Sequence, residues 1–238
     1  MPRPHDQLRE IEIRPNFLPG RPASVWYRSG GTIVLCHASV EDDVPPWMAG
    51  RGRGWVTAEY NMLPGSTSPR KRRERGGKVD GRTTEIQRLI GRSLRAAVDF
   101  DALGERTVHI DCDVLAADGG THTAAITGGW VALAAAVAAA VPGSGAKIGS
   151  GPITDHIAAV SVGVVGGQVT LDLDYPLDSA ADVDMNVVMT GGGQFVEIQG
   201  TGERTTFDGD QLSRMLDLAR GGIEALVQAQ RSALASIT

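Results

Sequence analysis

Cysteine is almost absent from this sequence: Cys36 and Cys112 are the only two among 238 residues. Two thiols exclude the dense disulfide framework that stabilises many small secreted domains. Each cysteine ends an apolar, strand-like run, TIVLC in one case and VHIDC in the other. We therefore expect two reduced, buried thiols in a cytoplasmic protein.

The sequence also lacks an apolar signal segment, because its first residues, MPRPHD, are polar and rich in proline. The longest apolar run is an alanine-rich stretch after Gly129, which is interrupted and only weakly hydrophobic. Such a composition favours a core helix over a membrane span. At 238 residues the chain is long enough to bury a hydrophobic core in one large domain or two small ones.

The net charge of −5 at pH 7 is unevenly distributed along the chain. Residues 68–95 contain ten Lys or Arg and three Asp or Glu, a local balance of +7, whereas the rest of the chain carries −12. A concentrated basic segment on an acidic protein indicates a polyanionic partner. The simpler interpretation, an acidic surface with incidental arginines, predicts no salt-dependent binding of a polyanion.

Residues 108–142 combine a predicted strand, a glycine turn and a helix. Apolar and polar residues alternate from Val108 to Val114, Gly119 and Gly120 allow a tight turn, and a helical pattern follows. Such a turn directs backbone N–H groups and the positive end of the helix dipole at one point. The segment is thus either a connector or a phosphate site to which side chains contribute, namely Thr121, His122 and Thr123.

Residues 66–81 form a predicted basic loop with almost no apolar residue. Such a segment is usually only solvated, but here a helix with a basic face follows it. The spacing from Thr84 to Gln87 predicts a capping box that opens this helix. Arg82 lies just before the cap, where a guanidinium and a helix N-terminus together bind an anion. The helix has an apolar stripe (Ile86, Leu89, Ile90, Leu94 and Val98) and a basic one (Arg88, Arg92 and Arg95).

Glycine and proline concentrate at residues 143–151, which we predict to connect an N-terminal half, residues 1–142, to a C-terminal half, residues 152–238. The second half has strand patterns at residues 157–165 and 169–174 and closes with an amphipathic helix after residue 210. Each half therefore has strands followed by a helix. The sequence predicts an α+β fold of duplicated strand–strand–helix layers, a single compact domain with two halves.

Five aspartates fall within residues 172–184. Asp172 and Asp182 are interpreted as solvated turn residues, whereas Asp184 adjoins an apolar strand, where an unpaired carboxylate is costly. Asp178 and Asp184 are a candidate Mg²⁺ pair, because two carboxylates hold this ion and leave positions for waters and phosphate oxygens. The spacing alone fits solvated aspartates equally well.

Together, six segments resemble the ribonuclease PH family of phosphate-dependent 3′ exoribonucleases. They occur in the family's order and span nearly the whole chain. They are GWVTAEYNMLP at 54–64, GRTTEIQRLIGRSLR at 81–95, DCDVLAADGGT at 111–121, AVSVGVV at 159–165, DSAADVDMNVVM at 178–189 and VEIQGTGE at 196–203.

The resemblance implies a ribonuclease PH-like fold and a nucleotidyltransferase that trims the 3′ ends of tRNA precursors, with a part in rRNA processing. Inorganic phosphate, the co-substrate, attacks the last phosphodiester and releases a nucleoside diphosphate. The resemblance also implies Mg²⁺ as cofactor and a homohexamer built as a trimer of dimers, in the cytoplasm and away from membranes.

The family's site residues map onto three groups in this chain. The phosphate site maps onto Arg82, Gly120, Thr121 and His122, and the metal site onto Asp178 and Asp184. The basic loop matches the region that holds the tRNA body, and the basic stripe of the helix extends it. The candidate RNA-binding residues are Arg70, Arg72, Arg73, Arg75, Arg88 and Arg92.

Two departures from the family pattern affect these expectations. The family has Arg where this chain has His122, and losing one charge-assisted hydrogen bond costs roughly 1.5–3 kcal/mol. We therefore expect weak or absent phosphorolysis, with residual activity favoured below about pH 6.5, where histidine gains a proton. The family's opening Arg-x-Asp-Gly-Arg is missing or shortened. The alternative function is a non-catalytic, RNA-binding ring subunit with the same fold.

Overall fold

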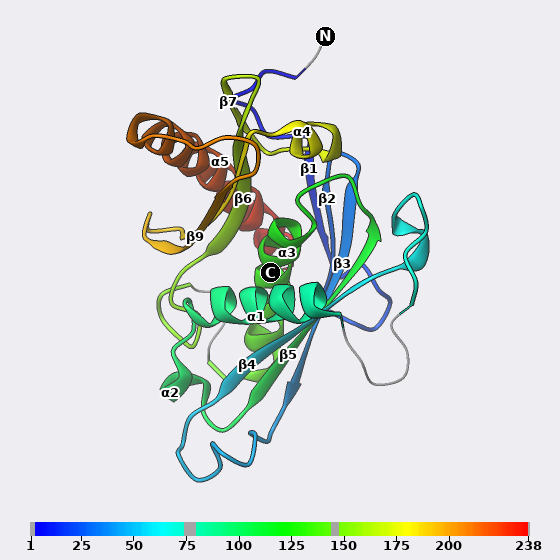
Figure 1. The fold of residues 1–238 in the computed structure, drawn as a ribbon. Helices are drawn as coiled ribbons and strands as arrows, with labels where there is room; N and C mark the ends of the chain where they lie inside the picture. Colours follow the sequence, from blue (N-terminus) through cyan, green and yellow to red (C-terminus); the bar gives the residue numbers. More distant parts are fainter. Residues whose placement is uncertain (1–2, 74–79, 144–147, 238) are drawn as a thin grey trace.

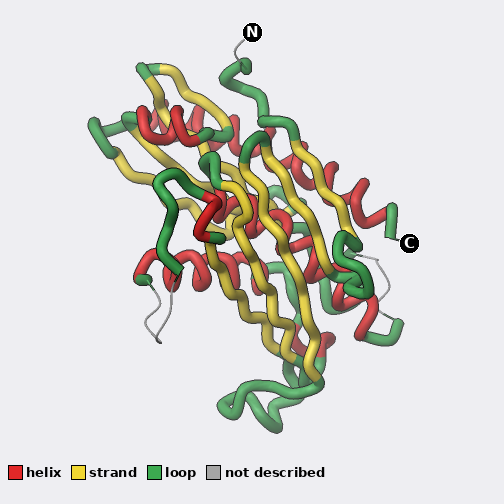
Figure 2. The backbone as a smooth tube through the Cα atoms, turned by 90° about the vertical axis from the view of Figure 1, so that its right-hand side faces the viewer, coloured by secondary structure: helices red, strands yellow, loops and turns green. Residues whose placement is uncertain are grey.

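Five strands form the larger of two sheets, in the order β1-β2-β3-β5-β4. All neighbouring strands are antiparallel except β4 and β5, which run parallel. Figure 2 shows these strands side by side, with helices behind them. Their bounds are β1 Ile11–Pro15, β2 Ser24–Ser29, β3 Thr32–Glu41, β4 Trp55–Met62 and β5 Thr107–Ala116. These positions come from a computed structural model that describes residues 3–73, 80–143 and 148–237.

The alternation predicted at residues 108–114 is present in β5, where the apolar side chains are buried and the polar ones are more exposed. Cys36 on β3 lies directly opposite Cys112 on β5 in the strand register. Both are buried, free thiols, which confirms the predicted state of the two cysteines.

Four strands form the second sheet, in the order β7-β6-β8-β9, with all neighbours antiparallel. Their bounds are β6 Ile157–Val165, β7 Gln168–Leu171, β8 Val183–Thr190 and β9 Phe195–Gly202. The strand predicted at 169–174 ends three residues too late, because the chain leaves the extended conformation at Asp172, which has φ of +55°.

Five α-helices complete the described part of the chain, together with a short 3₁₀ helix, η1. The helix after the basic loop begins at Gly81, with Asp80 as N-cap, so the predicted capping box at Thr84 is wrong. Arg82 consequently lies inside the first turn, and the helix ends before Val98. The bounds are η1 Pro64–Ser66, α1 Gly81–Arg95, α2 Phe100–Leu103, α3 Thr121–Ala140, α4 Tyr175–Ala180 and α5 Gly209–Ala235.

Helix α3 is the centre of the molecule, and Figure 1 shows it behind α1 and between the two sheets. It contacts strands of both sheets as well as α1 and α5. Its length and composition would allow a membrane span, but 83% of its most apolar window is buried within the protein. The prediction of a core helix is therefore confirmed.

One of two hydrophobic clusters among the described residues draws on both halves of the sequence. It contains Trp130 of α3 and Ile110 of β5, together with Ile157, Val188 and Leu234 from beyond the predicted connector. The predicted α+β architecture of two halves in one compact unit is thus confirmed. Within the connector at 143–151, residues 144–147 lie outside the described part of the chain, and the proposed division at this point stays a prediction.

Candidate active site

The glycine turn before α3 forms the floor of the site. Gly119 and Gly120 have φ of +76° and +64°, a backbone region that favours glycine. A Cβ atom on Gly119 would lie 2.6 Å from the carbonyl oxygen of Leu173 and 2.8 Å from the backbone nitrogen of Tyr175. The turn therefore packs directly on the chain that leads into α4, and no side chain fits between them.

Thr121, the first residue of α3, is held from the neighbouring sheet. The hydroxyl of Tyr60, on β4, lies 2.7 Å from Thr121 Oγ1. Burial raises the pKa of Tyr60 to about 12, so its hydroxyl stays protonated at neutral pH. The first N–H groups of a helix have no partner within the helix, so the start of α3 offers backbone donors together with the Thr121 hydroxyl.

The two candidate metal-binding carboxylates come from neighbouring elements. Asp178 lies on α4, whose N-cap residue Asp174 accepts a hydrogen bond from the Leu177 backbone at 3.0 Å. Asp184 lies on β8. Burial, followed by repulsion from the Asp178 carboxylate, raises the pKa of Asp184 to about 6. The pKa of Asp178 is also raised, chiefly by burial.

Arg82 supplies positive charge to these groups from α1. Its guanidinium opposes the rise in the pKa values of both Asp178 and Asp184. His122 also lies within reach of this charge. Burial lowers the pKa of His122 and the charge of Arg82 lowers it further, whereas the nearby Asn186 side chain acts in the opposite direction. His122 is therefore mostly neutral at pH 7.

One cavity of about 400 Å³ is lined by every residue of the predicted phosphate and metal sites. The basic loop contributes Thr67, Ser68 and Pro69 to the same wall. A second cavity of about 250 Å³ shares part of this lining. The residues common to both cavities are Arg82, His122, Asp184 and Asn186. The glycine turn and the aspartate pair, about sixty residues apart in sequence, thus face one space.

Two buried oxygen atoms in this space have no hydrogen-bond partner among the described residues, Asp184 Oδ1 and Asn186 Oδ1. Such atoms are costly unless a ligand satisfies them. Within the same described ranges no cluster of three or more His, Cys, Asp or Glu residues forms a metal site. Two carboxylates with an amide oxygen nearby fit Mg²⁺, which commonly takes one or two carboxylates and fills its shell with water and phosphate oxygens.

The predicted RNA-binding arginines are less closely grouped. Arg70, Arg72 and Arg73 are exposed on the basic loop, whereas Arg75 lies outside the described residues. The start of this loop is anchored, because Ser66 is buried and its carbonyl accepts a hydrogen bond from the Ala117 backbone. The first residues of the loop are therefore packed against the protein and are not simply solvated.

The basic stripe of α1 divides into different environments. Arg88 is exposed. Arg92 lines the second cavity and forms a two-point ion pair with Glu197 of β9, at 2.6 and 2.7 Å. Arg95 lies over the ring of Trp55, with its guanidinium carbon 4.6 Å from the ring centre. The stripe is thus not a continuous charged face available to a ligand, because the Arg95 guanidinium packs on Trp55.

Several residues that line the cavity escaped the sequence analysis, among them Tyr60, Ser161, Tyr175 and Asn186. Asn186 could have been found, because it lies two residues after Asp184 and so on the same face of a strand. Asp172 was interpreted wrongly. It is only 5% exposed and forms an ion pair with Arg9, so it is not a solvated turn residue.

Comparison with known proteins shows the family to which the chain belongs. Residues 7–139 match domain 1 of the 3′ exoribonuclease family, and residues 155–222 match domain 2. The chain is 64% identical to ribonuclease PH of Rhodopirellula baltica, over 99% of this chain and 97% of the relative. It is 54% identical to ribonuclease PH of Bacillus pumilus, over 97% and 95% of the two chains.

Solved structures show the same fold at low sequence identity. Rice Rrp46 superposes with a TM-score of 0.77 at 16% identity, covering 98% of each chain. A chain of the Archaeoglobus fulgidus exosome with RNA bound to the active site also has a TM-score of 0.77, at 20% identity, covering 95% of this chain and 90% of its own. On the strength of both matched domains and the full-length relatives, the chain belongs to the 3′ exoribonuclease family.

Proposed function

We propose that this protein is a phosphorolytic 3′-to-5′ exoribonuclease that trims the 3′ ends of tRNA precursors in the cytoplasm and also acts in rRNA processing. The observation that carries the proposal is the single cavity faced by Arg82, the Gly120–His122 turn and the pair Asp178 and Asp184. Relatives named ribonuclease PH over nearly the full length support the same reaction.

In the proposed reaction, an oxygen of inorganic phosphate attacks the phosphorus of the last phosphodiester bond. The bond from this phosphorus to the 3′ oxygen of the preceding nucleotide breaks. The products are a nucleoside diphosphate and an RNA shortened by one residue. No water is consumed, so the nucleotide product distinguishes this reaction from hydrolysis, which releases a monophosphate.

The chain's own residues bring two anions together. Arg82 and the first turn of α3 bind the attacking phosphate and offset its charge beside the RNA backbone. Tyr60 fixes the Thr121 hydroxyl at 2.7 Å, which orients it for this contact. Asp178, Asp184 and the amide oxygen of Asn186 would hold Mg²⁺. When bound, the ion supplies charge neutralisation for phosphate oxygens.

The exposed arginines of the basic loop, Arg70, Arg72 and Arg73, would bind the body of the tRNA. Arg75, Arg88 and Arg92 complete the proposed RNA-binding set, with Arg92 already paired to Glu197. We further propose a homohexameric ring, a trimer of dimers. The fold shared with exosome subunits supports a ring-forming surface.

A direct assay tests the proposal and the non-catalytic alternative together. The protein is incubated with a tRNA carrying extra 3′ nucleotides, with and without phosphate and Mg²⁺. We expect nucleoside diphosphate only when both are present, and none from Asp184→Asn. RNA binding without nucleotide release under every condition would favour the ring subunit. Release of monophosphate without added phosphate would contradict phosphorolysis.

A further inference from the structure

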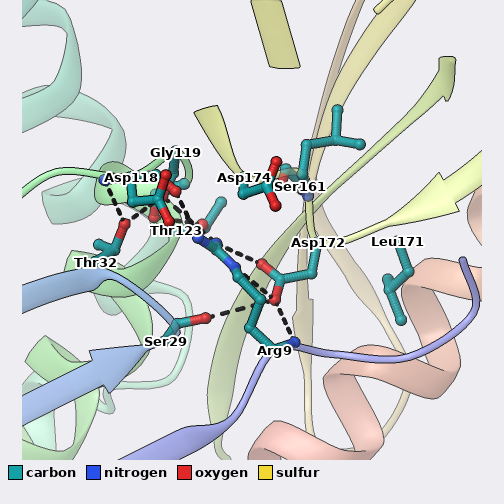
Figure 3. A network of polar contacts seen from close by, with 12 residues as sticks. Arg9, Ser29, Thr32, Asp118, Gly119, Thr123, Ser161, Leu171, Asp172 and Asp174 are labelled. Atoms are coloured by element: carbon teal, nitrogen blue, oxygen red, sulfur yellow. Dashed lines mark hydrogen bonds and ion pairs between the residues drawn. The ribbon is translucent and has the colours of Figure 1, made fainter. Parts of the chain in front are cut away.

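Arg9 is not among the residues assigned a role above. It is only 8% exposed, and all three nitrogens of its guanidinium donate hydrogen bonds. Figure 3 shows its guanidinium between Asp172 on one side and the backbone of the glycine turn on the other. Its Nε and Nη2 atoms donate to the two oxygens of Asp172 at 3.0 and 2.7 Å. Its backbone N–H also donates to Asp172, at 2.8 Å.

The same guanidinium holds the turn that precedes α3. Nη1 donates to the carbonyl of Asp118 at 2.5 Å, and Nη2 donates to the carbonyl of Gly119 at 3.4 Å. The Thr32 hydroxyl donates to the same Gly119 carbonyl at 2.6 Å and accepts from the Asp118 backbone. The turn is therefore held both by Thr32 of β3 and by Arg9, which precedes β1.

Asp172 begins the segment that leads to the metal-binding carboxylates. Its backbone N–H donates to the Ser161 carbonyl at 2.7 Å, and the next residue, Leu173, donates to the Ser161 hydroxyl at 3.0 Å. Two residues later α4 starts, and Asp178 lies within it. Burial alone would raise the pKa of Asp172, but the hydrogen bonds and charge of Arg9 outweigh it and lower the pKa.

We propose that Arg9 is a positioning residue, which sets the spacing between the phosphate-binding turn at Gly119–Thr121 and the carboxylate-bearing segment at 172–178. The inference rests on the proposed function for the meaning of that spacing. The contacts themselves join Arg9 to Asp118, 109 residues later in the sequence, and to Asp172, 163 residues later. A buried ion pair is by itself weak support for stability, whereas a planar guanidinium can serve two partners in fixed geometry.

Arg9→Lys separates positioning from simple charge pairing. Lysine retains the positive charge beside Asp172, but its single ammonium cannot also reach both turn carbonyls in the plane that the guanidinium uses. Arg106→Lys is the matched control. Arg106 likewise joins a carboxylate, Asp42 at 2.9 Å, to a backbone carbonyl, Leu103 at 3.0 Å, and it lies at the opposite end of β5.

The first measurement is amide hydrogen exchange, which does not require activity. We expect exchange at least tenfold faster in Arg9→Lys for peptides covering the turn at 118–122 and the segment at 173–181, with Arg106→Lys unchanged in both. If Arg9→Lys does not fold, Asp172→Asn, which leaves Arg9 without a charged partner, should show the same pair of changes. Unchanged exchange in these two peptides, in whichever variant folds, would overturn the proposal.

The second measurement is turnover. We expect the KM for phosphate to rise about tenfold in Arg9→Lys, with RNA affinity within twofold of the parent and Arg106→Lys within twofold in both. A kcat and a phosphate KM within twofold of the parent would contradict positioning. If the parent releases no nucleoside diphosphate while the two peptides still respond to Arg9→Lys, the positioning role stands and the proposed function fails.

Discussion

Replacing His122 by arginine is the sharpest test of the phosphate site. His122 is the second residue of α3 and lines both cavities, so a longer side chain has space on either side of it. Its lowered pKa keeps the imidazole mostly neutral at pH 7. Arginine would add a permanent charge and a second hydrogen bond to phosphate, worth about 1.5–3 kcal/mol. We expect the KM for phosphate to fall roughly 10- to 100-fold.

The assay is release of nucleoside diphosphate from an extended tRNA at pH 7.5, with phosphate titrated at saturating RNA. His122→Gln is the control, because glutamine is polar and of similar size but carries no charge at any pH. The KM for phosphate should fall in His122→Arg, whereas in His122→Gln it should rise or stay equal to that of the parent. A phosphate KM in His122→Arg within twofold of the parent would refute the account of position 122.

The structure also reduces the gain in activity at low pH that the sequence predicts for this site. Because the pKa of His122 is lowered, its charged form appears only at pH values below the ordinary 6.5. Protonation of Asp184 opposes a gain in activity at these pH values. Its pKa of about 6 means that the carboxylate proposed to hold Mg²⁺ loses its charge over the same pH range. The expected advantage below about pH 6.5 is therefore smaller than the sequence alone suggests, and its measurement requires the His122→Gln baseline.

Three further changes test neighbouring parts of the site. Activity at low Mg²⁺ should fall as pH drops through about 6, because Asp184 becomes protonated, and higher Mg²⁺ should move this midpoint to lower pH; a midpoint independent of Mg²⁺ would argue against a metal at Asp184. Gly119→Ala places a Cβ atom 2.6 Å from the Leu173 carbonyl at a positive φ, so we expect a loss of about 1–3 kcal/mol in urea unfolding, and an unchanged midpoint would refute the close packing. Tyr60→Phe removes the hydrogen bond to Thr121, worth about 0.5–1.5 kcal/mol, so the phosphate KM should rise roughly two- to tenfold while thermal stability changes little; an unaltered KM would show that Thr121 needs no support.

Local patterns in the sequence were enough to place most of the fold. The alternation in β5, the buried run of β6 and the glycine turn before α3 each depend on neighbouring residues, and each was predicted. The start of α1 was placed four residues late, because Asp80 and Thr84 are both ordinary capping residues and the sequence does not rank them.

The groups of the site that were missed depend on contacts between distant residues. Tyr60 reaches Thr121 across 61 positions, and Arg9 reaches Asp172 across 163. No spacing or periodicity connects such residues, because parallel pairing of β4 with β5 and the packing of the two halves bring them together. Asp172 shows the difficulty most clearly, since a turn aspartate and a buried ion-pair aspartate have the same local sequence.

The length and apolarity of α3 have a consequence for the unfolded chain. When the two sheets separate, the twenty residues of α3 become exposed to solvent. This segment is long and apolar enough to cross a bilayer. Exposed apolar surface of this kind makes an unfolded chain prone to aggregation. We therefore expect heating to end in precipitation. The resistance of the protein to heat is then set by the rate at which the two sheets separate, and not by an unfolding equilibrium.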